Sequence, residues 1–272
     1  MNKAAIKSQI NANISAFIQM KYIQIMFMTA SQLAESVGTS QGSVSRFCMS
    51  LGFNGFNDFK KTLGELVSRE ITLPQRLAYT ENAAMDNEAI YTSEHNNIEK
   101  IKNLMKTEGY HELKTSMAQS KEITLISARM SATLLPYIFY LLNNIRTGVR
   151  SITPNDPAWD TMALNGSKEK LIVALMFPRY SNILLSKLRE LKGGGFRIVV
   201  ISDEGFPYPL AAEFNHIKLP TTVSSIFDIY SAPILFLNIL ARDIARETGN
   251  LAERMKALEE IEGKNNIYFK NQ

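Results

Sequence analysis

The sequence predicts two domains of different fold class: an all-α helix-turn-helix N-terminal domain, and an α/β flavodoxin-like C-terminal domain with a five-stranded parallel sheet. Apolar residues repeat at helical spacing early in the chain, whereas short apolar segments alternate with helical ones from Glu122 onwards. A chain of 272 residues with 45% hydrophobic content is long enough for two cores. We expect the helix-turn-helix domain at 1–80, a linker and connecting helix at 81–106, the α/β domain at 107–250 and a C-terminal tail at 251–272.

The first predicted element is a helix over residues 3–27. Isoleucines recur in it every four residues, at Ile6, Ile10, Ile14 and Ile18. The next segment, 29–53, is typical of two short helices around a tight turn. Thr29 or Ser31 can cap the first of these helices.

The second helix of this hairpin follows a turn at Gly38 and is capped by Ser40. Its predicted buried stripe is Val44, Phe47, Cys48 and Leu51. The opposite face is small and polar and carries Gln41, Gly42, Ser43, Ser45, Arg46, Met49 and Ser50. Such a helix can enter the major groove of DNA. The alternative is an ordinary helical hairpin with an inert polar surface, but the spacing of Ala34, Gly38 and Val44 favours the helix-turn-helix.

Three aromatic residues after the hairpin are expected to seal its small core: Phe53, Phe56 and Phe59. They lead into a predicted helix at about 57–69, a mixed linker at 70–92 and a polar helix at 93–106. The expected DNA contacts are Ser31, Ser40, Gln41, Ser43, Ser45, Arg46, Lys60 and Lys61.

The positive charge of the chain is concentrated in the same region. Of 30 basic and 26 acidic residues, residues 1–80 hold eight and four, so 22 of each remain in 81–272. The whole excess of +4 therefore accompanies the helix-turn-helix, where DNA phosphates would lie.

The compartment predicted from composition is the cytoplasm, with no membrane association. A single cysteine, Cys48, excludes an intrachain disulfide, and its place on the apolar stripe indicates a packing role. The N-terminal residues lack the layout of a signal peptide. The longest apolar stretch, 229–241, is shorter than the ~20 residues of a membrane span and is expected to be a buried helix.

Five strands are predicted in the second domain, at 122–128, 148–153, 170–177, 196–202 and 216–219. Helices are expected near 130–146, 158–165, 181–192, 207–213 and 224–247. Three consecutive glycines at 193–195 separate a helix from the next strand. Ligands of such sheets bind at the carboxyl ends of the strands, where the strand order reverses.

Two of these strand ends carry residues suited to an anion. The first strand ends in Ser127-Ala-Arg-Met-Ser131 and the third in Phe177-Pro-Arg-Tyr-Ser181, and each runs directly into a helix. Free backbone N–H groups at a helix start and an arginine fork both favour phosphate. The alternative is that Ser131 and Ser181 only cap their helices. The presence of two such loops on adjacent strands favours a phosphate site.

The chain resembles an RpiR-type transcriptional regulator, in which an N-terminal helix-turn-helix precedes a SIS (sugar isomerase) domain. The N-terminal resemblance rests on Leu33-Ala34, Gly38-Thr39-Ser40, Ser45-Arg46-Phe47, Leu51-Gly52-Phe53, Gly55-Phe56 and Phe59-Lys60. The C-terminal resemblance rests on Phe177–Ser181, Gly195, Ile201-Ser-Asp203 and Pro209-Leu-Ala211. The resemblance implies a homodimer or homotetramer that binds a double-stranded DNA operator and senses a phosphorylated sugar.

The resemblance also implies which residues hold the sugar phosphate. Ser131 belongs to the first ligand loop, the second loop provides Arg179, Tyr180 and Ser181, and a third segment provides Ser224 and Ser225. The first loop departs from the Gly-x-Gly-x-Ser pattern of SIS domains, because Ser127 and Arg129 replace both glycines. Arg129 could contact the anion directly or could occupy the pocket. The second loop also lacks the Ser-x-Ser-Gly-x-Thr form of the catalytic relatives, and Tyr208 stands where serine is frequent.

The sequence favours a sensor over an enzyme, and no cofactor is expected. Sugar-phosphate isomerisation needs a positioned base, usually glutamate or histidine. The ligand loops contain no glutamate, and the three histidines, at 95, 111 and 216, fall away from the expected ligand. The sequence has no zinc-ligand cluster and no Walker loop. A SIS-domain sugar-phosphate isomerase or related enzyme is the alternative, and a protein-interaction adaptor is a weaker one.

Overall fold

The computed structural model describes residues 3–26, 28–67, 72–77, 87–165, 169–223 and 227–268. The chain divides into two compact units. The first comprises Met1–Ile90 with Thr222–Asp228, and the second comprises Tyr91–Thr221 with Ile229–Gln272. The segment Thr222–Asp228 therefore groups with the N-terminal unit, although the residues before and after it belong to the second unit.

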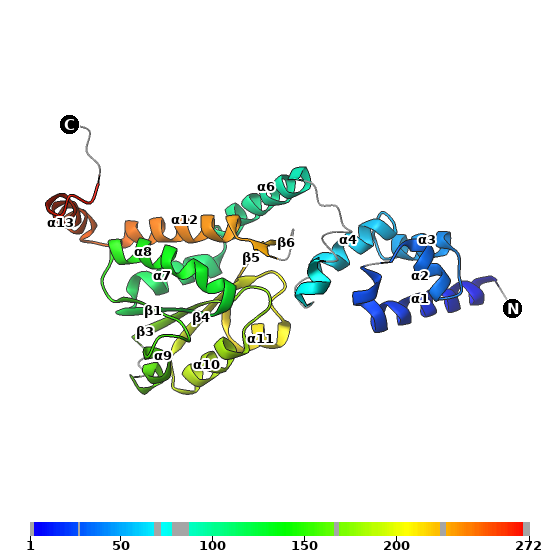
Figure 1. The fold of residues 1–272 in the computed structure, drawn as a ribbon, viewed down its shortest axis with the longest axis horizontal. Helices are drawn as coiled ribbons and strands as arrows, with labels where there is room; N and C mark the ends of the chain where they lie inside the picture. Colours follow the sequence, from blue (N-terminus) through cyan, green and yellow to red (C-terminus); the bar gives the residue numbers. More distant parts are fainter. Residues whose placement is uncertain are drawn as a thin grey trace. The chain divides into compact units, whose positions relative to one another are not determined.

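The first unit contains the helices α1 (Lys3–Ile25), α2 (Ala30–Ser36), α3 (Gln41–Ser50) and α4 (Phe56–Val67) (Figure 1), and residues 73–77 are also helical. Their buried residues form one apolar cluster of Ile14, Ile25, Leu33, Ala34, Val44, Phe47, Cys48, Phe56 and Phe59. The predicted aromatic seal is present: the Phe53 and Phe59 rings lie 5.3 Å apart, edge to face. Burial raises the pKa of the Cys48 thiol to about 11, as expected for a packing residue.

The turn between α2 and α3 has the predicted construction. Thr29, and not Ser31, is the N-cap of α2, and it exchanges backbone and side-chain hydrogen bonds with Gln32 in a capping box. Gly38 has φ +69°, the left-handed conformation that favours glycine. Ser40 then caps α3 by accepting a hydrogen bond from the Ser43 amide.

The predicted buried stripe of α3 is wrong at its last position. Val44, Phe47 and Cys48 are buried, but Leu51 is 53% exposed. The reason is that α3 ends at Ser50, so Leu51 no longer follows helical periodicity. The chain turns at Gly52, which has φ +95°, and Phe53 packs against the core in its place.

The second unit is built on a five-stranded, all-parallel sheet in the order β2-β1-β3-β4-β5. Its strands are β1 (Glu122–Ser127), β2 (Val149–Ile152), β3 (Lys170–Leu175), β4 (Arg197–Asp203) and β5 (Asn215–Leu219). All five predicted strands are confirmed, with ends that differ by at most two residues. The strand order reverses between β1 and β3, which makes their carboxyl ends the switch point.

Helices cover both faces of the sheet (Figure 1). One layer contains α7 (Glu108–Gln119), α8 (Leu135–Ile145) and α12 (Ser231–Glu247), and the other contains α9 (Ala158–Thr161), α10 (Asn182–Gly193) and α11 (Tyr208–Glu213). Alternate strand residues enter the two cores: Leu125 packs with the first layer and Ile126 with the second. Two further helices belong mostly or wholly to this unit, α6 (Asn87–Leu104) and α13 (Leu251–Lys264).

Several predicted helices have different limits. The helix expected at 224–247 begins at Ser231, because short paired strands β6 (Thr222–Val223) and β7 (Asp228–Ile229) precede it. The helix expected at 130–146 starts as a 3₁₀ segment, η1 (Arg129–Leu134). The segment at 158–165 likewise ends in a 3₁₀ turn, η2 (Met162–Asn165). The polar helix predicted from 93 begins at Asn87, and the predicted tail contains α13.

Candidate DNA-binding face and ligand site

The outer face of α3 is exposed along its length. Gln41, Gly42, Arg46, Met49 and Ser50 are exposed, while Ser43 and Ser45 are half-buried. Met49 is the large apolar member of this face, with 52% of its surface exposed. The first turn of α3 contains no acidic residue. The face therefore offers small polar groups and one cation to the surface, as a helix that enters a DNA groove requires.

Arg46 lies back along its own helix. Its Nη2 donates to Ser43 Oγ at 3.2 Å, and Ser43 Oγ lies 3.0 Å from Ser40 Oγ. Gly42 provides the space, because a Cβ there would meet Arg46 Nη1 at 3.2 Å. The guanidinium is thus held over the first turn of α3 while it remains exposed.

The predicted DNA contacts outside α3 differ in their exposure. Ser31 on α2 and Lys61 on α4 are exposed. Lys60 is half-buried, and its Nζ donates to the Met28 carbonyl at 3.2 Å. Lys60 therefore ties α4 to the chain just before α2, so its ammonium already has a structural partner.

At the switch point of the sheet, serine hydroxyls join neighbouring strand ends. Ser127 Oγ donates to the Leu175 carbonyl at 2.7 Å, and Ser131 Oγ accepts from the Phe177 amide at 3.0 Å. Ser131 is buried, with 6% exposed. Its hydroxyl proton can still be donated, because the bond from Phe177 uses only an oxygen lone pair.

The two predicted arginines share an unusual backbone conformation. Arg129 has φ +60° and Arg179 has φ +61°, and both lie in the left-handed region where glycine is usual. Both side chains are exposed and have no hydrogen-bond or ion-pair partner within the described parts of the chain. The glycine-to-arginine replacement at 129 therefore leaves a glycine-like backbone. Strained residues of this kind cluster at functional sites.

The serine and tyrosine of the second loop have defined partners. Ser181 caps α10 by accepting from the Leu184 amide at 3.4 Å. Tyr180 OH donates to Asp203 Oδ1 at 2.6 Å. Asp203 ends β4, is fully buried and also accepts from the Gly205 amide at 2.8 Å. The sequence interpretation did not select Asp203, although a carboxylate that ends a buried strand is a detectable signal.

The third predicted ligand segment cannot be placed. Ser224 and Ser225 lie outside the described residues. After them, Asp228 forms a buried ion pair with Arg76 at 3.0 Å within the first unit.

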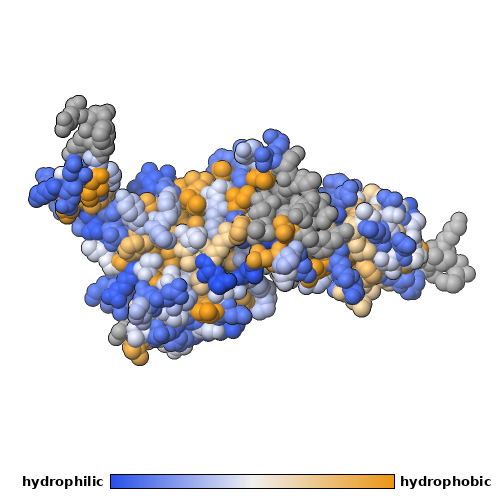
Figure 2. Space-filling view, in the orientation of Figure 1, coloured by the Kyte–Doolittle hydropathy of each residue, from blue (hydrophilic) through white to orange (hydrophobic). Residues whose placement is uncertain are grey.

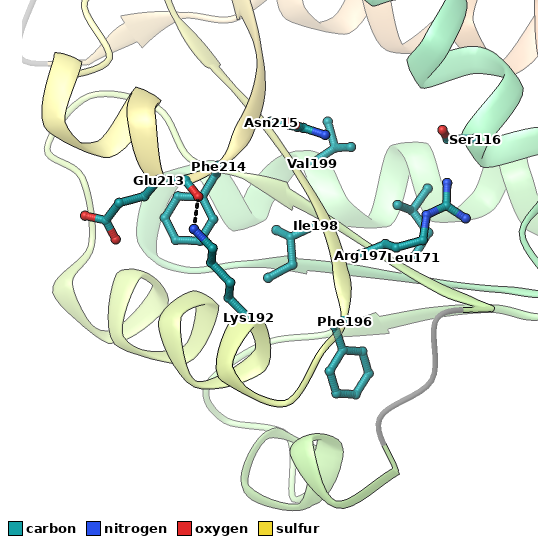
Figure 3. A pocket seen from close by; sticks show the side chains of 10 residues that line it. All are labelled: Ser116, Leu171, Lys192, Phe196, Arg197, Ile198, Val199, Glu213, Phe214 and Asn215. Carbon is teal, nitrogen blue, oxygen red and sulfur yellow. Dashed lines mark hydrogen bonds between the residues drawn. The ribbon is translucent and has the colours of Figure 1, made fainter.

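A hollow of about 400 Å³ lies at the other end of the sheet (Figure 3). Residues at the amino ends of β4 and β5, such as Arg197 and Asn215, line it. Its charged groups Lys192 and Glu213 are already engaged: Lys192 Nζ donates to the Glu213 carbonyl, and the Glu213 carboxylate pairs with Arg189 at 2.6 Å. Arg197 is exposed and makes no hydrogen bond or ion pair with the described residues either. We place the candidate site at the carboxyl ends instead, because the strand order reverses there and both arginines there have a left-handed backbone.

The three histidines lie on three different elements. His95 is on α6, His111 is on α7, and His216 is in β5 opposite Val200 of β4. Across the described segments, no three His, Cys, Asp or Glu side chains are grouped so that they could hold a metal ion. No helix in the described part of the chain combines the length and apolar character needed to cross a bilayer.

Known proteins resemble each of the two units. Residues 7–70 match the family model of the helix-turn-helix domain, rpiR family. The NanR protein of Vibrio vulnificus, solved in complex with ManNAc-6P, superposes with a TM-score of 0.57 and 15% identity, covering 93% of this chain and 92% of NanR. The sugar isomerase domain of the RpiR transcription factor from Sphaerobacter thermophilus gives 0.56 and 17%, covering 63% of this chain and 95% of that one. No curated protein matches the sequence.

These comparisons show that the chain combines a helix-turn-helix domain with a unit of the sugar isomerase (SIS) fold. Residues 7–70 are thus a helix-turn-helix domain of the rpiR type, and the second unit shares its fold with the sugar isomerase domain of the Sphaerobacter thermophilus protein.

Proposed function

We propose that the protein is a transcriptional regulator of a sugar-metabolism operon, and that a phosphorylated sugar bound at the strand ends changes its affinity for operator DNA. One observation carries the proposal: an RpiR-family helix-turn-helix with an exposed α3 is joined in one chain to a SIS-fold unit whose switch point has two exposed arginines without a partner among the described residues.

DNA binding is assigned to α3. Arg46 is the cation of its outer face, and Gln41 and Ser45 provide neutral polar groups beside it. Lys61 and Ser31, on the neighbouring helices, are the proposed phosphate contacts, since both are exposed. The basic excess of residues 1–80 adds attraction to the DNA backbone.

Ligand binding is assigned to the carboxyl ends of β1 and β3. Arg129 and Arg179 offer forked N–H donors that match phosphate oxygens, and Ser131 offers a hydroxyl. The start of α10 at Asn182 adds free backbone amides and the positive end of a helix dipole. The NanR complex with ManNAc-6P supports a phosphosugar as the class of ligand.

The protein is proposed to act as a homodimer or homotetramer. A palindromic operator presents two half-sites, and two copies of α3 would read successive major grooves. Exposed apolar residues of the second unit, including Tyr140 on α8, Ile234 on α12 and Ile261 on α13, offer surface for pairing. Figure 2 shows hydrophobic residues over this helical layer among hydrophilic ones.

A sugar-phosphate isomerase is the alternative function, and the strand ends favour it less. The described loops after β1 and β3 present arginine, serine and tyrosine and contain no carboxylate, and Asp203 at the end of β4 is buried and bonded to Tyr180. An isomerase would need a base directed at the sugar carbon.

The experiment is a mobility-shift assay with the full-length protein and the region upstream of its own operon. Random duplex of equal length is the control. A thermal-shift screen of sugar phosphates selects the effector, which is then added to the assay. Specific binding that the effector changes supports the proposal. Binding no better than to random duplex, with and without effector, would overturn it.

A further inference from the structure

The loop between β3 and α10 is bonded to the strand ends on both of its sides. On the β1 side, the Phe177 amide donates to Ser131 Oγ at 3.0 Å. On the β4 side, the Met176 amide donates to the Ile201 carbonyl at 3.0 Å, and Tyr180 OH donates to Asp203. Arg179 therefore lies between two fixed points, the Phe177 amide before it and the Tyr180 side chain after it.

The contact between Tyr180 and Asp203 is well enclosed. The two oxygens are 2.6 Å apart, Asp203 is fully buried and Tyr180 is half-buried. The Tyr180 ring also meets Phe206 edge to face at 5.6 Å. The second carboxylate oxygen of Asp203 accepts from the Gly205 amide. The hydroxyl of Tyr180 is thus committed to β4, and its ring is packed.

This anchoring explains how Arg179 keeps a left-handed backbone. A side chain at φ +61° is disfavoured unless the surrounding structure imposes it. Tyr180 follows Arg179 directly, so fixing its side chain fixes the orientation of the peptide between them. Arg129 has the same left-handed φ, but its bonded neighbours are Ser127 and Ser131, whereas Met130 directly after it is 37% exposed.

We propose that Tyr180 and Asp203 are positioning residues that hold Arg179 in its left-handed conformation, so that its guanidinium is presented at the strand ends for a phosphate group. The inference rests on the proposed function of this site. The sequence predicted that Tyr180 contacts the ligand. In this proposal Tyr180 does not touch the phosphate but acts by holding Arg179. The proposal also assigns a role to Asp203.

The test is a double-mutant cycle in the full-length protein, with inorganic phosphate as the probe and calorimetry as the readout. Tyr180→Phe should weaken phosphate binding about tenfold in the unmodified background, because it removes a hydrogen bond to a charged acceptor. It should have no further effect when Arg179 is already alanine. An equal loss in both backgrounds, or no loss in the first, would overturn the proposal. Tyr91→Phe, on the 68% exposed Tyr91, is the matched control.

Two variants of Asp203 separate positioning from a general loss of structure. Asp203→Ala should lower phosphate affinity as Tyr180→Phe does. Asp203→Asn should retain most of it, because an amide can still accept from Gly205 and donate to the tyrosine oxygen. Equal losses from both variants would count against the proposal.

Hydrogen–deuterium exchange of the ligand-free protein gives a readout independent of phosphate. Tyr180→Phe should raise amide exchange in residues 179–181 and leave β1 and β3 unchanged. If the unmodified protein failed to bind any phosphorylated probe, the proposed function would fall, while this exchange would still decide whether Tyr180 holds the loop. Unchanged exchange would overturn the positioning role.

Discussion

The two proposed binding regions use arginine in opposite ways. Arg46 lies on a regular helix, and its contact with Ser43 spans three residues of sequence. Arg179 lies on a strained loop whose anchors come from residues 23 and 46 positions apart in sequence, at Tyr180–Asp203 and Ser131–Phe177. A DNA-reading face needs only a capped helix, whereas an anion site needs several strand ends brought together. Substitutions of neighbouring residues should therefore disturb Arg46 on α3 less than they disturb Arg179 at the strand ends.

The largest expected effect is that of Arg179→Ala on the effector response. Removing one partner of a charge-assisted contact costs about 2–5 kcal/mol, so sugar-phosphate binding should fall by at least about thirtyfold while DNA binding stays intact. The free sugar without its phosphate should bind poorly to the unmodified protein. Calorimetry with a matched pair of sugar and sugar phosphate measures both.

Arg197→Ala is the matched control, because Arg197 is equally exposed but lies at the amino end of β4. Equal affinity for sugar and sugar phosphate, or a full response in Arg179→Ala, would remove the phosphate site from the comparison. Arg129→Ala tests the second arginine of the site. A loss of sugar-phosphate affinity would mean that Arg129 holds the ligand, and a gain would mean that Arg129 fills the pocket.

The next effect is that of Arg46→Ala on operator binding. A bidentate contact to guanine provides about 1–3 kcal/mol of discrimination, whereas a phosphate contact would weaken all sequences about equally. Comparing operator with random duplex separates these cases, and salt titration counts phosphate contacts at about 0.9 in log–log slope for each. Arg150→Ala, which removes the same charge from β2, should leave both affinities unchanged. Unchanged affinity for both duplexes in Arg46→Ala itself would mean that Arg46 faces solvent or a neighbouring helix and does not contact DNA.

The same contrast explains how much the sequence could predict. The hairpin follows from local rules, so the caps at Thr29 and Ser40 and the turn at Gly38 were predicted correctly. The five strands were also predictable, because a parallel sheet buried on both faces leaves long apolar runs. The predictions from sequence fail where contacts between residues far apart in the chain determine the local structure. Leu51 is exposed because α3 ends at Ser50 and Phe53 packs against the core instead, and the helix expected from 130 begins as a 3₁₀ segment beside the bonded strand ends. Nothing local in the sequence joins Tyr180 to Asp203.

The third effect tests the turn of the hairpin. Gly38→Ala places a Cβ at φ +69° and should destabilise the first unit by about 1–2 kcal/mol. The surrounding space is open, so backbone strain is the cause and not a clash. Gly193→Ala is the control, because Gly193 ends α10 without a left-handed φ and has open space around it. Chemical denaturation monitored by circular dichroism measures both, and equal stability of the two variants would refute the turn assignment.

The smallest effect separates capping from DNA contact at the start of α2. Thr29→Ala breaks the capping box and should cost about 1 kcal/mol of stability, since the Gln32 amide loses the Thr29 hydroxyl as its acceptor, while the backbone N–H of residue 29 can still donate to the Gln32 side chain. Ser31→Ala should leave stability within about 0.5 kcal/mol, because Ser31 is exposed and makes no cap. If Ser31 contacts a DNA phosphate, the same variant should weaken binding to operator and random duplex alike. A loss of stability in Ser31→Ala, or none in Thr29→Ala, would show that the local rules which made this region predictable do not govern its energetics.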